Sequence, residues 1–164
     1  MLDLTTRPAN DCTPDPEAVI RHRGEHAGRF RRSSEIAAAI RADIKQAMRD
    51  GGLPQMKVSI TSERYSMGQS VTVTIRQAPF AVLNPARVAW EKAGEPGSHA
   101  DAPHWHTARA RQIEARIEAI AAEYVRSETH GPSDLYNCNC SITVGYDSDI
   151  TRAERAALLA GGAQ

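Results

Sequence analysis

The sequence predicts an α+β protein, a two-layer sandwich in which helices cover one face of a small, mainly antiparallel sheet. Three observations support this prediction. Residues 56–75 form two runs in which apolar and polar residues alternate, with a polar turn between them. Residues 34–50 and 107–127 carry apolar side chains at every third or fourth position, as amphipathic helices do. Strands that are apolar on one side only need helices stacked on that side.

The alternating runs predict the two strands of a hairpin, and a shorter run predicts a third strand. The apolar positions of the hairpin are Val58, Ile60, Val71, Val73 and Ile75. The polar positions between them include Lys57, Ser59, Thr72, Thr74 and Arg76. Residues 141–146 alternate in the same way, with Ile142 and Val144 between Ser141 and Thr143. A period of two residues is typical of strands with one buried and one open face.

Four segments predict helices. In residues 34–50, isoleucine recurs every fourth residue at Ile36, Ile40 and Ile44, and a Gly-Gly pair follows that can end the helix. Residues 84–94 begin with an Asn-Pro pair, which suits a helix start. Residues 107–127 form the longest predicted helix. A short C-terminal helix is predicted to begin at Thr151, which forms a capping-box pattern with Glu154.

The first 32 residues differ from the rest of the chain in composition. They contain the proline-rich stretch RPANDCTPDPEA and the arginine-rich stretch RHRGEHAGRFRR. Prolines and glycines interrupt regular structure, and there is little here to bury in a core. We therefore expect residues 1–32 to be a flexible arm. Residues 33–164 are predicted to form a single α+β domain that ends in the short C-terminal helix.

The uncovered face of the predicted sheet is the candidate surface for a partner. On this face we expect partner contacts from Lys57, Ser59, Thr72, Thr74 and Arg76. Arg64 and Tyr65 in the hairpin loop, and Arg29, Arg31 and Arg32 in the arm, are expected to extend it. An aromatic ring beside arginines favours contact with nucleic acid, because bases stack on such rings. The alternative is that Tyr65 packs over its own loop and the arm is a solvated linker.

One group of residues has the chemistry of a metal site. His104 and His106, together with Cys138 and Cys140, could hold zinc in a tetrahedral Cys2His2 arrangement between the middle loop and the last strand. Zinc sites usually have two residues between paired cysteines, whereas here there is one. The alternative interpretation is that the cysteines are small buried apolar residues and that the histidines lie on a loop.

The net charge and the hydrophobic pattern of the sequence argue against some classes of protein. Twenty basic and twenty acidic residues cancel, so the whole molecule has no electrostatic attraction for nucleic acid, although a local basic patch remains possible. No apolar run approaches the roughly 20 residues that span a bilayer. The first residues lack the pattern of a secretory signal, and three cysteines do not make a disulfide framework. We expect a cytoplasmic protein, in a bacterial host cell, that does not contact a membrane.

Residues 53–79, LPQMKVSITSERYSMGQSVTVTIRQAP, resemble the core of the large polyvalent protein-associated domain 29 family. The matching positions are Pro54, Val58, Ser59, Ser62, Tyr65, Gly68, Ser70 and Val73. The family often closes its second strand with Asp-Gly-Pro, where this chain has Gln77, Ala78 and Pro79. The resemblance implies a domain carried by phages and conjugative elements, with counter-defence as one proposed role. It implies no catalytic residues.

These observations favour a non-enzymatic interaction protein of a phage or mobile element. Its partner would be a host macromolecule, and inhibition of a host defence complex is one form of this hypothesis. Nucleotide-binding, hydrolase-elbow and HExxH motifs are absent from the sequence. The first alternative is a nucleic-acid-binding module. The second is a small protein that zinc stabilises or that depends on a metal for its activity.

Overall fold

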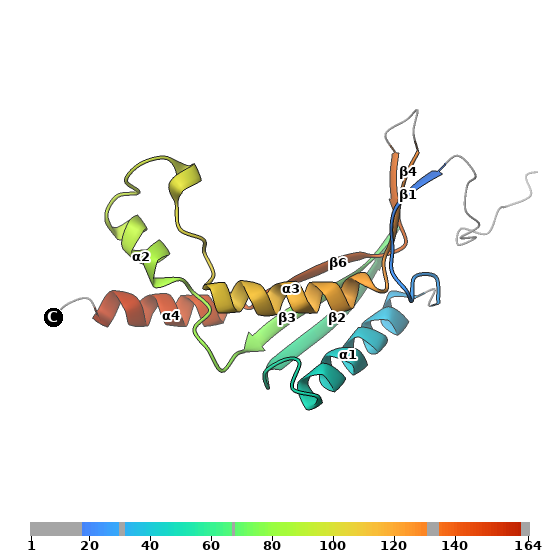
Figure 1. The fold of residues 1–164 in the computed structure, drawn as a ribbon, viewed down its shortest axis with the longest axis horizontal. Coiled ribbons are helices and arrows are strands. Elements are labelled where there is room, and N and C mark those ends of the chain that lie inside the picture. The colour runs from blue at the N-terminus through green and yellow to red at the C-terminus, as the bar shows by residue number, and fades with distance from the viewer. Residues whose placement is uncertain (1–17, 30–31, 67, 131–134, 162–164) are drawn as a thin grey trace, which may run out of the picture.

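The predicted α+β class is confirmed by a computed structural model of the chain (Figure 1). The structure describes residues 18–29, 32–66, 68–130 and 135–161, with side chains for residues 23–29, 32–66, 68–127 and 139–161. The described elements are, in order, β1 (Ala18–Arg23), α1 (Ser33–Arg49), β2 (Lys57–Tyr65), β3 (Gly68–Gln77), α2 (Pro85–Lys92), the single 3-10 turn η1 (His99–Asp101), α3 (Ala108–Ala122), β4 (Arg126–His130), β5 (Leu135–Cys138), β6 (Ser141–Tyr146) and α4 (Ser148–Gly161).

The main sheet has the strand order β2-β3-β6. β2 and β3 form the predicted antiparallel hairpin, with Thr61 opposite Thr72. β6 lies on the other side of β3 and runs parallel to it, with Thr143 opposite Thr72. The hairpin pairing is antiparallel, as the sequence predicts for most of the sheet, and the third strand adds one parallel pairing, so the main sheet is mixed. The long connection through α2 and α3 returns the chain to the end of the sheet where β3 began, which a parallel pairing requires.

Two helices, α1 and α3, lie side by side over one face of the main sheet (Figure 1). The apolar sides of both helices face the strands. The side chains that meet between the helix layer and the sheet are almost completely buried: Ile36, Ile40 and Ile44 from α1, Ile113 and Ile117 from α3, and Val71, Val73 and Ile75 from β3. Burying each such side chain stabilises the fold by about 1.5–3 kcal/mol relative to leaving it in water. The two-layer arrangement expected from the sequence is present in the main sheet.

A second sheet, which the sequence analysis did not predict, has the order β1-β4-β5, and all its pairings are antiparallel. It lies at one end of the molecule, beyond the end of α3 (Figure 1). The expectation of a flexible arm is wrong for residues 18–23, because these form β1 and pair with β4. After β1, the backbone N–H of Gly24 donates to the carbonyl of Val125 at 2.9 Å, and that of His26 donates to Glu123 at 2.8 Å. Residues 1–17 and 30–31 of the expected arm lie outside the described residues.

Two helix boundaries differ from the prediction. α3 ends at Ala122, because the chain turns there to enter β4, so the buried Tyr124 follows the helix and does not belong to it. α4 begins at Ser148, one turn before the predicted start at Thr151. The expected capping role of Glu154 is therefore wrong. Its carboxylate instead accepts hydrogen bonds from backbone N–H groups of the segment before α2.

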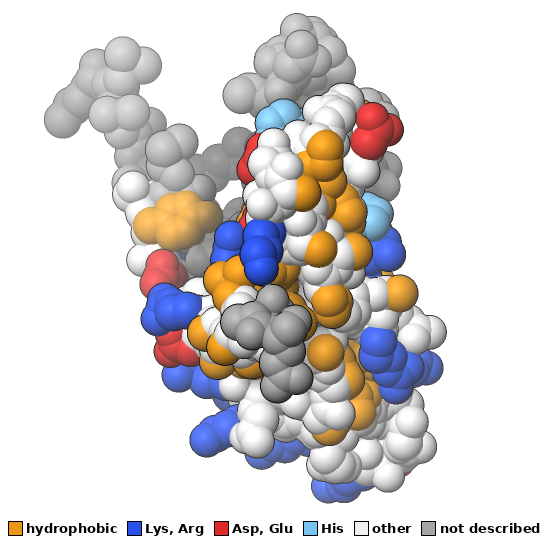
Figure 2. All heavy atoms as spheres, turned by 90° about the vertical axis from the view of Figure 1, so that its left-hand side faces the viewer, with side chains coloured by type: hydrophobic (Ala, Val, Ile, Leu, Met, Phe, Trp, Pro, Cys, Tyr) orange, Lys and Arg blue, Asp and Glu red, His pale blue; other side chains and the backbone are white. Residues whose placement is uncertain are grey.

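At the end of the molecule opposite the second sheet, α2 and α4 contact each other (Figure 1). No residue of α4 is completely buried, and Leu158 and Leu159 near its end are exposed. Figure 2 looks onto this end and shows hydrophobic side chains gathered among lysines and arginines. Among the described residues, no helix is long and apolar enough to cross a membrane.

Candidate interaction site

The side of the main sheet that faces away from α1 and α3 carries three cross-strand rows of small polar residues. We call this surface the open face. Its rows are Ser59, Thr74 and Gly145; Thr61, Thr72 and Thr143; and Glu63, Ser70 and Ser141, each row crossing β2, β3 and β6. Successive side chains of a strand point to opposite faces. Since Val71 and Val73 point into the core, Ser70, Thr72 and Thr74 point away from the helices.

Solvent reaches the open face in all three rows. Thr61, Thr72, Ser141 and Thr143 are exposed, and Ser59, Ser70 and Thr74 are half-buried. A Cβ atom added at Gly145 would meet no atom within 4 Å. No described segment therefore covers this face. The sequence-based expectation that Ser59, Thr72 and Thr74 share one uncovered side of the sheet agrees with the structure.

Charged residues and one aromatic residue lie at the two ends of the open face. Lys57 and Arg76 are exposed at the end where β3 leaves the sheet, and the Arg76 guanidinium lies 4.0 Å from the Asp147 carboxylate. Tyr65 lies at the hairpin tip with about half of its surface exposed, 52%.

The hairpin turn is shorter than expected, because Arg64 and Tyr65, which were predicted to lie in the loop, belong to β2. β2 continues to Tyr65 and β3 begins at Gly68, and these two residues are paired directly. A Cβ atom added at Gly68 would lie 3.1 Å from a ring carbon of Tyr65, so the tyrosine ring lies against the glycine. An aromatic side chain placed across from a glycine covers backbone that would otherwise be exposed. Tyr65 therefore both packs on its own hairpin, as the alternative interpretation held, and presents an exposed ring.

Apart from Arg76, the predicted arginines that the structure describes do not join the open face. Arg64 is paired with Gln69, whose side-chain oxygen accepts a 2.7 Å hydrogen bond from the backbone of Ser33 at the start of α1. Arg64 thus belongs to the side of the hairpin that the helices cover. Arg32 directly precedes α1, and its backbone N–H donates to Glu35 at 3.2 Å.

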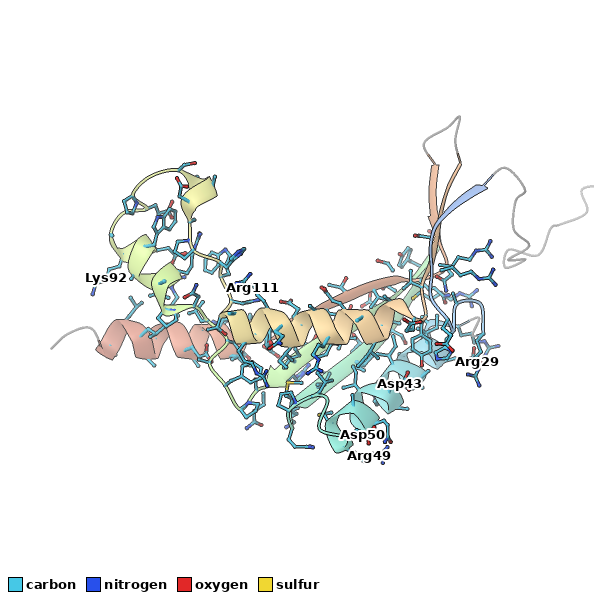
Figure 3. All side chains as sticks on the ribbon, in the orientation of Figure 1. Arg29, Asp43, Arg49, Asp50, Lys92 and Arg111 are labelled. Carbon is cyan, nitrogen blue, oxygen red and sulfur yellow. The ribbon has the colours of Figure 1, made fainter. Side chains whose placement is uncertain are left out.

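Arg29 also lies on the helix side. Figure 3 shows it at the end of the molecule where α1 begins, near Asp43 of that helix. Arg31 lies outside the described residues. The surface predicted from the sequence is therefore divided in the structure: its sheet residues and Tyr65 are together, and its described arginines, apart from Arg76, are on the opposite side.

The predicted zinc ligands are also separated. His106 contacts Tyr146, the last residue of β6, with the ring centres 5.1 Å apart. Cys140 directly precedes the first residue of the same strand and is buried in the core. The histidine and cysteine halves of the predicted site therefore lie at opposite ends of β6. The backbone carbonyl of His104 accepts from the side chain of Asn84 at 2.9 Å, and the Cys138 side chain lies outside the described part.

No group of three or more His, Cys, Asp or Glu side chains in the described part of the chain is arranged to hold a metal ion. Cys140, the cysteine whose side chain is described, is buried among the apolar residues of the core, as a small apolar residue would be. Its thiol contacts the backbone carbonyl of Ser141 at 3.6 Å.

Two tyrosines on the helix side have perturbed ionisation. Burial, and then a hydrogen bond from its hydroxyl to Asp43 of α1, hold the pKa of Tyr124 well above its ordinary value. Burial, and then the negative charge of Glu114, raise the pKa of Tyr146 in the same way. The Tyr146 hydroxyl donates to the Ala110 carbonyl of α3 at 2.8 Å. Both hydroxyls therefore remain protonated at neutral pH and tie helices to neighbouring elements.

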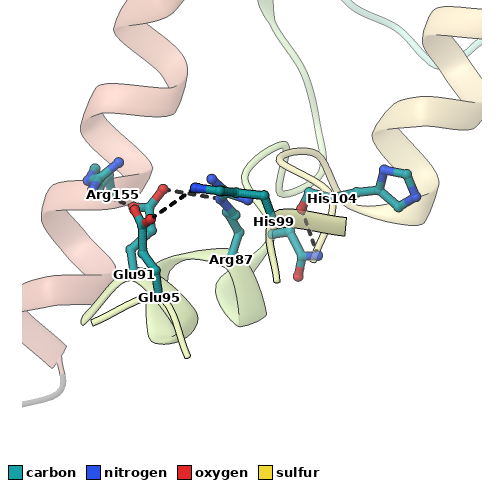
Figure 4. Close-up of polar contacts among 7 residues, drawn as sticks. Arg87, Glu91, Glu95, His99, His104 and Arg155 are labelled. Carbon is teal, nitrogen blue, oxygen red and sulfur yellow. Dashed lines mark hydrogen bonds and ion pairs between the residues drawn. The ribbon is translucent and has the colours of Figure 1, made fainter. Parts of the chain in front are cut away.

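The sequence analysis did not identify a second polar surface, which lies around Trp105 and α4. There Glu91 of α2 accepts hydrogen bonds from two arginines, Arg87 at 3.1 Å and Arg155 at 2.5 Å (Figure 4). Trp105 is exposed beside them. The sequence held one signal for this surface, since Arg152 and Arg155 are three residues apart and so lie on one side of the predicted C-terminal helix.

Comparison with protein-family models, with curated proteins and with solved structures finds no match to this chain.

Proposed function

We propose that this chain is a non-enzymatic interaction protein that binds another protein through the open face of its main sheet. The observation that carries the proposal is the uncovered grid of hydroxyl side chains across β2, β3 and β6. Serine and threonine hydroxyls both donate and accept hydrogen bonds, so they can match the polar groups of a flat partner surface. These short side chains also lose little conformational freedom on binding, whereas long flexible side chains lose much more.

The charges around the open face favour a protein partner over nucleic acid. Binding along the phosphate backbone of a nucleic acid needs a local excess of lysines and arginines over carboxylates. Here Arg76 is paired with Asp147, and Lys57 at one end is balanced by Glu63 at the other. The open face is therefore nearly neutral. Nucleic acid remains the alternative partner for this surface, supported by the exposed ring of Tyr65.

The biological setting of the proposal comes from the resemblance of residues 53–79 to the large polyvalent protein-associated domain 29 family. On that basis the partner is a protein of a bacterial host, and the chain belongs to a phage or another mobile element. Inhibition of a host defence complex is the form of the proposal that this setting favours.

The proposal is tested by placing a long charged side chain at the centre of the open face. Thr72→Arg changes an exposed residue of the middle row, so the fold should be retained. We expect the variant to lose the host protein that the wild-type chain retains in affinity capture from a bacterial lysate. Capture should weaken little between low and moderate salt, because the interface contains few phosphate-like contacts.

The matched control is Ala42→Arg, which adds the same side chain at an exposed position of α1. It should leave capture unchanged. If Thr72→Arg retains the same partner as Ala42→Arg and the wild-type chain, the open face is not the binding surface. If the retained partner is removed by nuclease and by salt, the nucleic-acid alternative is correct.

A further inference from the structure

A hollow of about 290 Å³ lies at the α2–α4 end of the molecule and shares no residue with the open face. Its lining includes Leu83, Trp105, His106, Thr151, Arg152 and Arg155. The hollow therefore combines an aromatic ring, an apolar floor and two guanidinium groups. These groups come from the segment before α2, the segment before α3, and α4.

Trp105 is an exposed ring that its neighbours hold in place. The guanidinium of Arg87 lies 4.4 Å from the centre of the Trp105 ring and 4.7 Å from that of Trp90, so this arginine contacts both indoles. The backbone carbonyl of Trp105 accepts a 2.8 Å hydrogen bond from Asn84. Even so, 49% of the Trp105 surface is exposed. An aromatic ring that is held in this way and open to solvent is a stacking platform for a planar ligand.

Arg152 and Arg155 place two guanidinium groups on the α4 side of the hollow, close to three carboxylates: Glu91, Asp149 and Glu154, the last of which accepts from the backbone of Leu83 in the lining. Arg155 shares the carboxylate of Glu91 with Arg87, so within the described part of the chain these two guanidiniums pair with one carboxylate. Arg152 pairs with Asp149 at 2.9 Å, but both side chains are more than 70% exposed, at 75% and 78%. Such an exposed pair contributes little stability, so Arg152 can exchange its carboxylate for a ligand anion at small cost.

We propose that this hollow binds a nucleotide, with the base stacked on Trp105 and the phosphate held by Arg152 and Arg155. Guanidinium groups bind phosphate through paired, charge-assisted hydrogen bonds. The hollow is close to the lower end of the roughly 300–1,000 Å³ range of ligand sites, which leaves room for one nucleotide and not for two stacked ones. A free mononucleotide and one residue of a single strand both have this chemistry.

The probes are AMP, adenosine, inorganic phosphate and a ten-residue oligodeoxyadenylate, added to the full chain labelled with 15N. The readout is the indole N–H signal of Trp105, one of two such signals because the sequence has two tryptophans. AMP should shift this signal and bind more tightly than adenosine or phosphate alone. Equal affinity for AMP and the oligonucleotide assigns the site to free nucleotides, and much tighter binding of the oligonucleotide assigns it to single strands.

Two variants test the two halves of the site. Trp105→Leu should weaken AMP binding about ten-fold or more, because it removes the stacking contact. Binding to this variant, which has no Trp105 indole, is followed at the backbone N–H signals of Thr151 and Arg152 in the lining of the hollow. Arg152→Gln should weaken it several-fold, and this exposed residue can be changed without disturbing the fold. The matched control is Arg116→Gln, an exposed arginine of α3 that does not line the hollow.

Three results would overturn the inference. The first is an unshifted Trp105 signal at about 10 mM AMP, a concentration above the millimolar dissociation constants of weak ligands. The second is unchanged affinity in Arg152→Gln. The third is phosphate or adenosine binding as tightly as AMP. None of these results bears on the open face, because the two surfaces have no residue in common.

Discussion

At the scale of single residues, two glycines differ in how closely other parts of the chain approach them. Gly24 is buried, and a Cβ atom there would lie 2.3 Å from the backbone carbon and oxygen of Glu123. No side chain fits at this distance, so β1 can reach the end of α3 only because residue 24 is a glycine. Gly145 on the open face is the opposite case, since an added Cβ atom would meet nothing within 4 Å.

We expect Gly24→Ala to destabilise the protein by about 1–3 kcal/mol, because the backbone must shift to admit the methyl group. Gly145→Ala should change the free energy of unfolding by no more than about 0.5 kcal/mol, as exposed substitutions usually do. Urea unfolding of both variants measures the difference. Equal effects of the two substitutions would contradict the close contact between β1 and α3.

Asn139 shows how one side chain can join several elements. Its side-chain oxygen accepts from the backbone of Arg126 at 2.7 Å, and its side-chain nitrogen donates to the carbonyl of Tyr124 at 3.0 Å. Its backbone carbonyl accepts from the side chain of Gln69 at 2.9 Å. These bonds hold the start of β4 and the start of β3 near the entry to β6, which connects the two sheets.

At the scale of elements, α4 is held to the body of the protein by side-chain hydrogen bonds of Glu154 and Arg155 and not by a completely buried face. The carboxylate of Glu154 accepts hydrogen bonds from the backbone of Val82 at 3.0 Å and of Leu83 at 2.6 Å. Both of those residues are almost completely buried. The carboxylate thus satisfies two backbone donors of a buried segment that has few other partners for them.

We expect Glu154→Ala to cost about 1–3 kcal/mol, because it leaves those two N–H groups without an acceptor. Hydrogen exchange at Val82 and Leu83 should become faster, while exchange in α1 should change much less. Glu118→Ala, at an exposed position of α3, is the control and should leave both exchange rates unchanged. Unchanged exchange at Val82 in Glu154→Ala would show that α4 is held by other contacts.

The elements also show what the sequence could predict. α1 and the hairpin have complete apolar periodicity over many residues, and both were predicted within a few residues of their bounds. β4 and β5 are five and four residues long, and β4 has the polar sequence Arg-Ser-Glu-Thr-His. Such strands form because partners supply their backbone hydrogen bonds, which leaves no periodic pattern in the sequence. The direction of β6 depends on the route of the chain, which alternation of residues does not reveal.

The candidate sites likewise contain features that no local pattern in the sequence reveals. The alternation of residues was enough to place Thr72 and Thr74 on one uncovered face. It could not show that Arg64 is on the other face, because the residue pattern predicts a loop at this position whereas Arg64 belongs to β2 in the structure. The hollow around Trp105 is built from segments far apart in the chain, so its residues come together only in the folded structure.

At the scale of the whole molecule, buried tyrosine hydroxyls make stability depend on alkaline pH. A tyrosine in an unfolded chain has a pKa of about 10. The pKa values of Tyr124 and Tyr146 are raised in the folded protein, chiefly by burial. Above pH 10 the unfolded chain releases these protons and the folded protein retains them. The resulting stability is therefore complete below about pH 10 and is lost as the pH rises towards the raised values.

We expect the free energy of unfolding to fall between about pH 10 and pH 11.5, and to fall less steeply in Tyr124→Phe and Tyr146→Phe. Phe substitution at the exposed Tyr65 is the matched control for the loss of a tyrosine hydroxyl. Urea unfolding at a series of pH values gives the slopes. Identical slopes in all four proteins would show that these hydroxyls do not control alkaline unfolding.

Within the described residues, the open face and the hollow differ in their chemistry. One is the nearly neutral open face on the side of the sheet away from the helices, and the other is the hollow beside α4 that Arg152 and Arg155 line. The proposed function depends on the first of these. It requires that a partner contact the hydroxyl rows directly, and that the outer surface of α1 remain free of that partner.

Photo-crosslinking tests this requirement most directly. A photoreactive amino acid placed at Thr72 or at Ala42, in chains expressed in bacteria, reports what lies against the sheet and against α1. We predict a crosslink from position 72 to one host protein and none from position 42. A crosslink from position 42 alone, equal crosslinks from both positions, or a nucleic-acid adduct at position 72 would contradict the account.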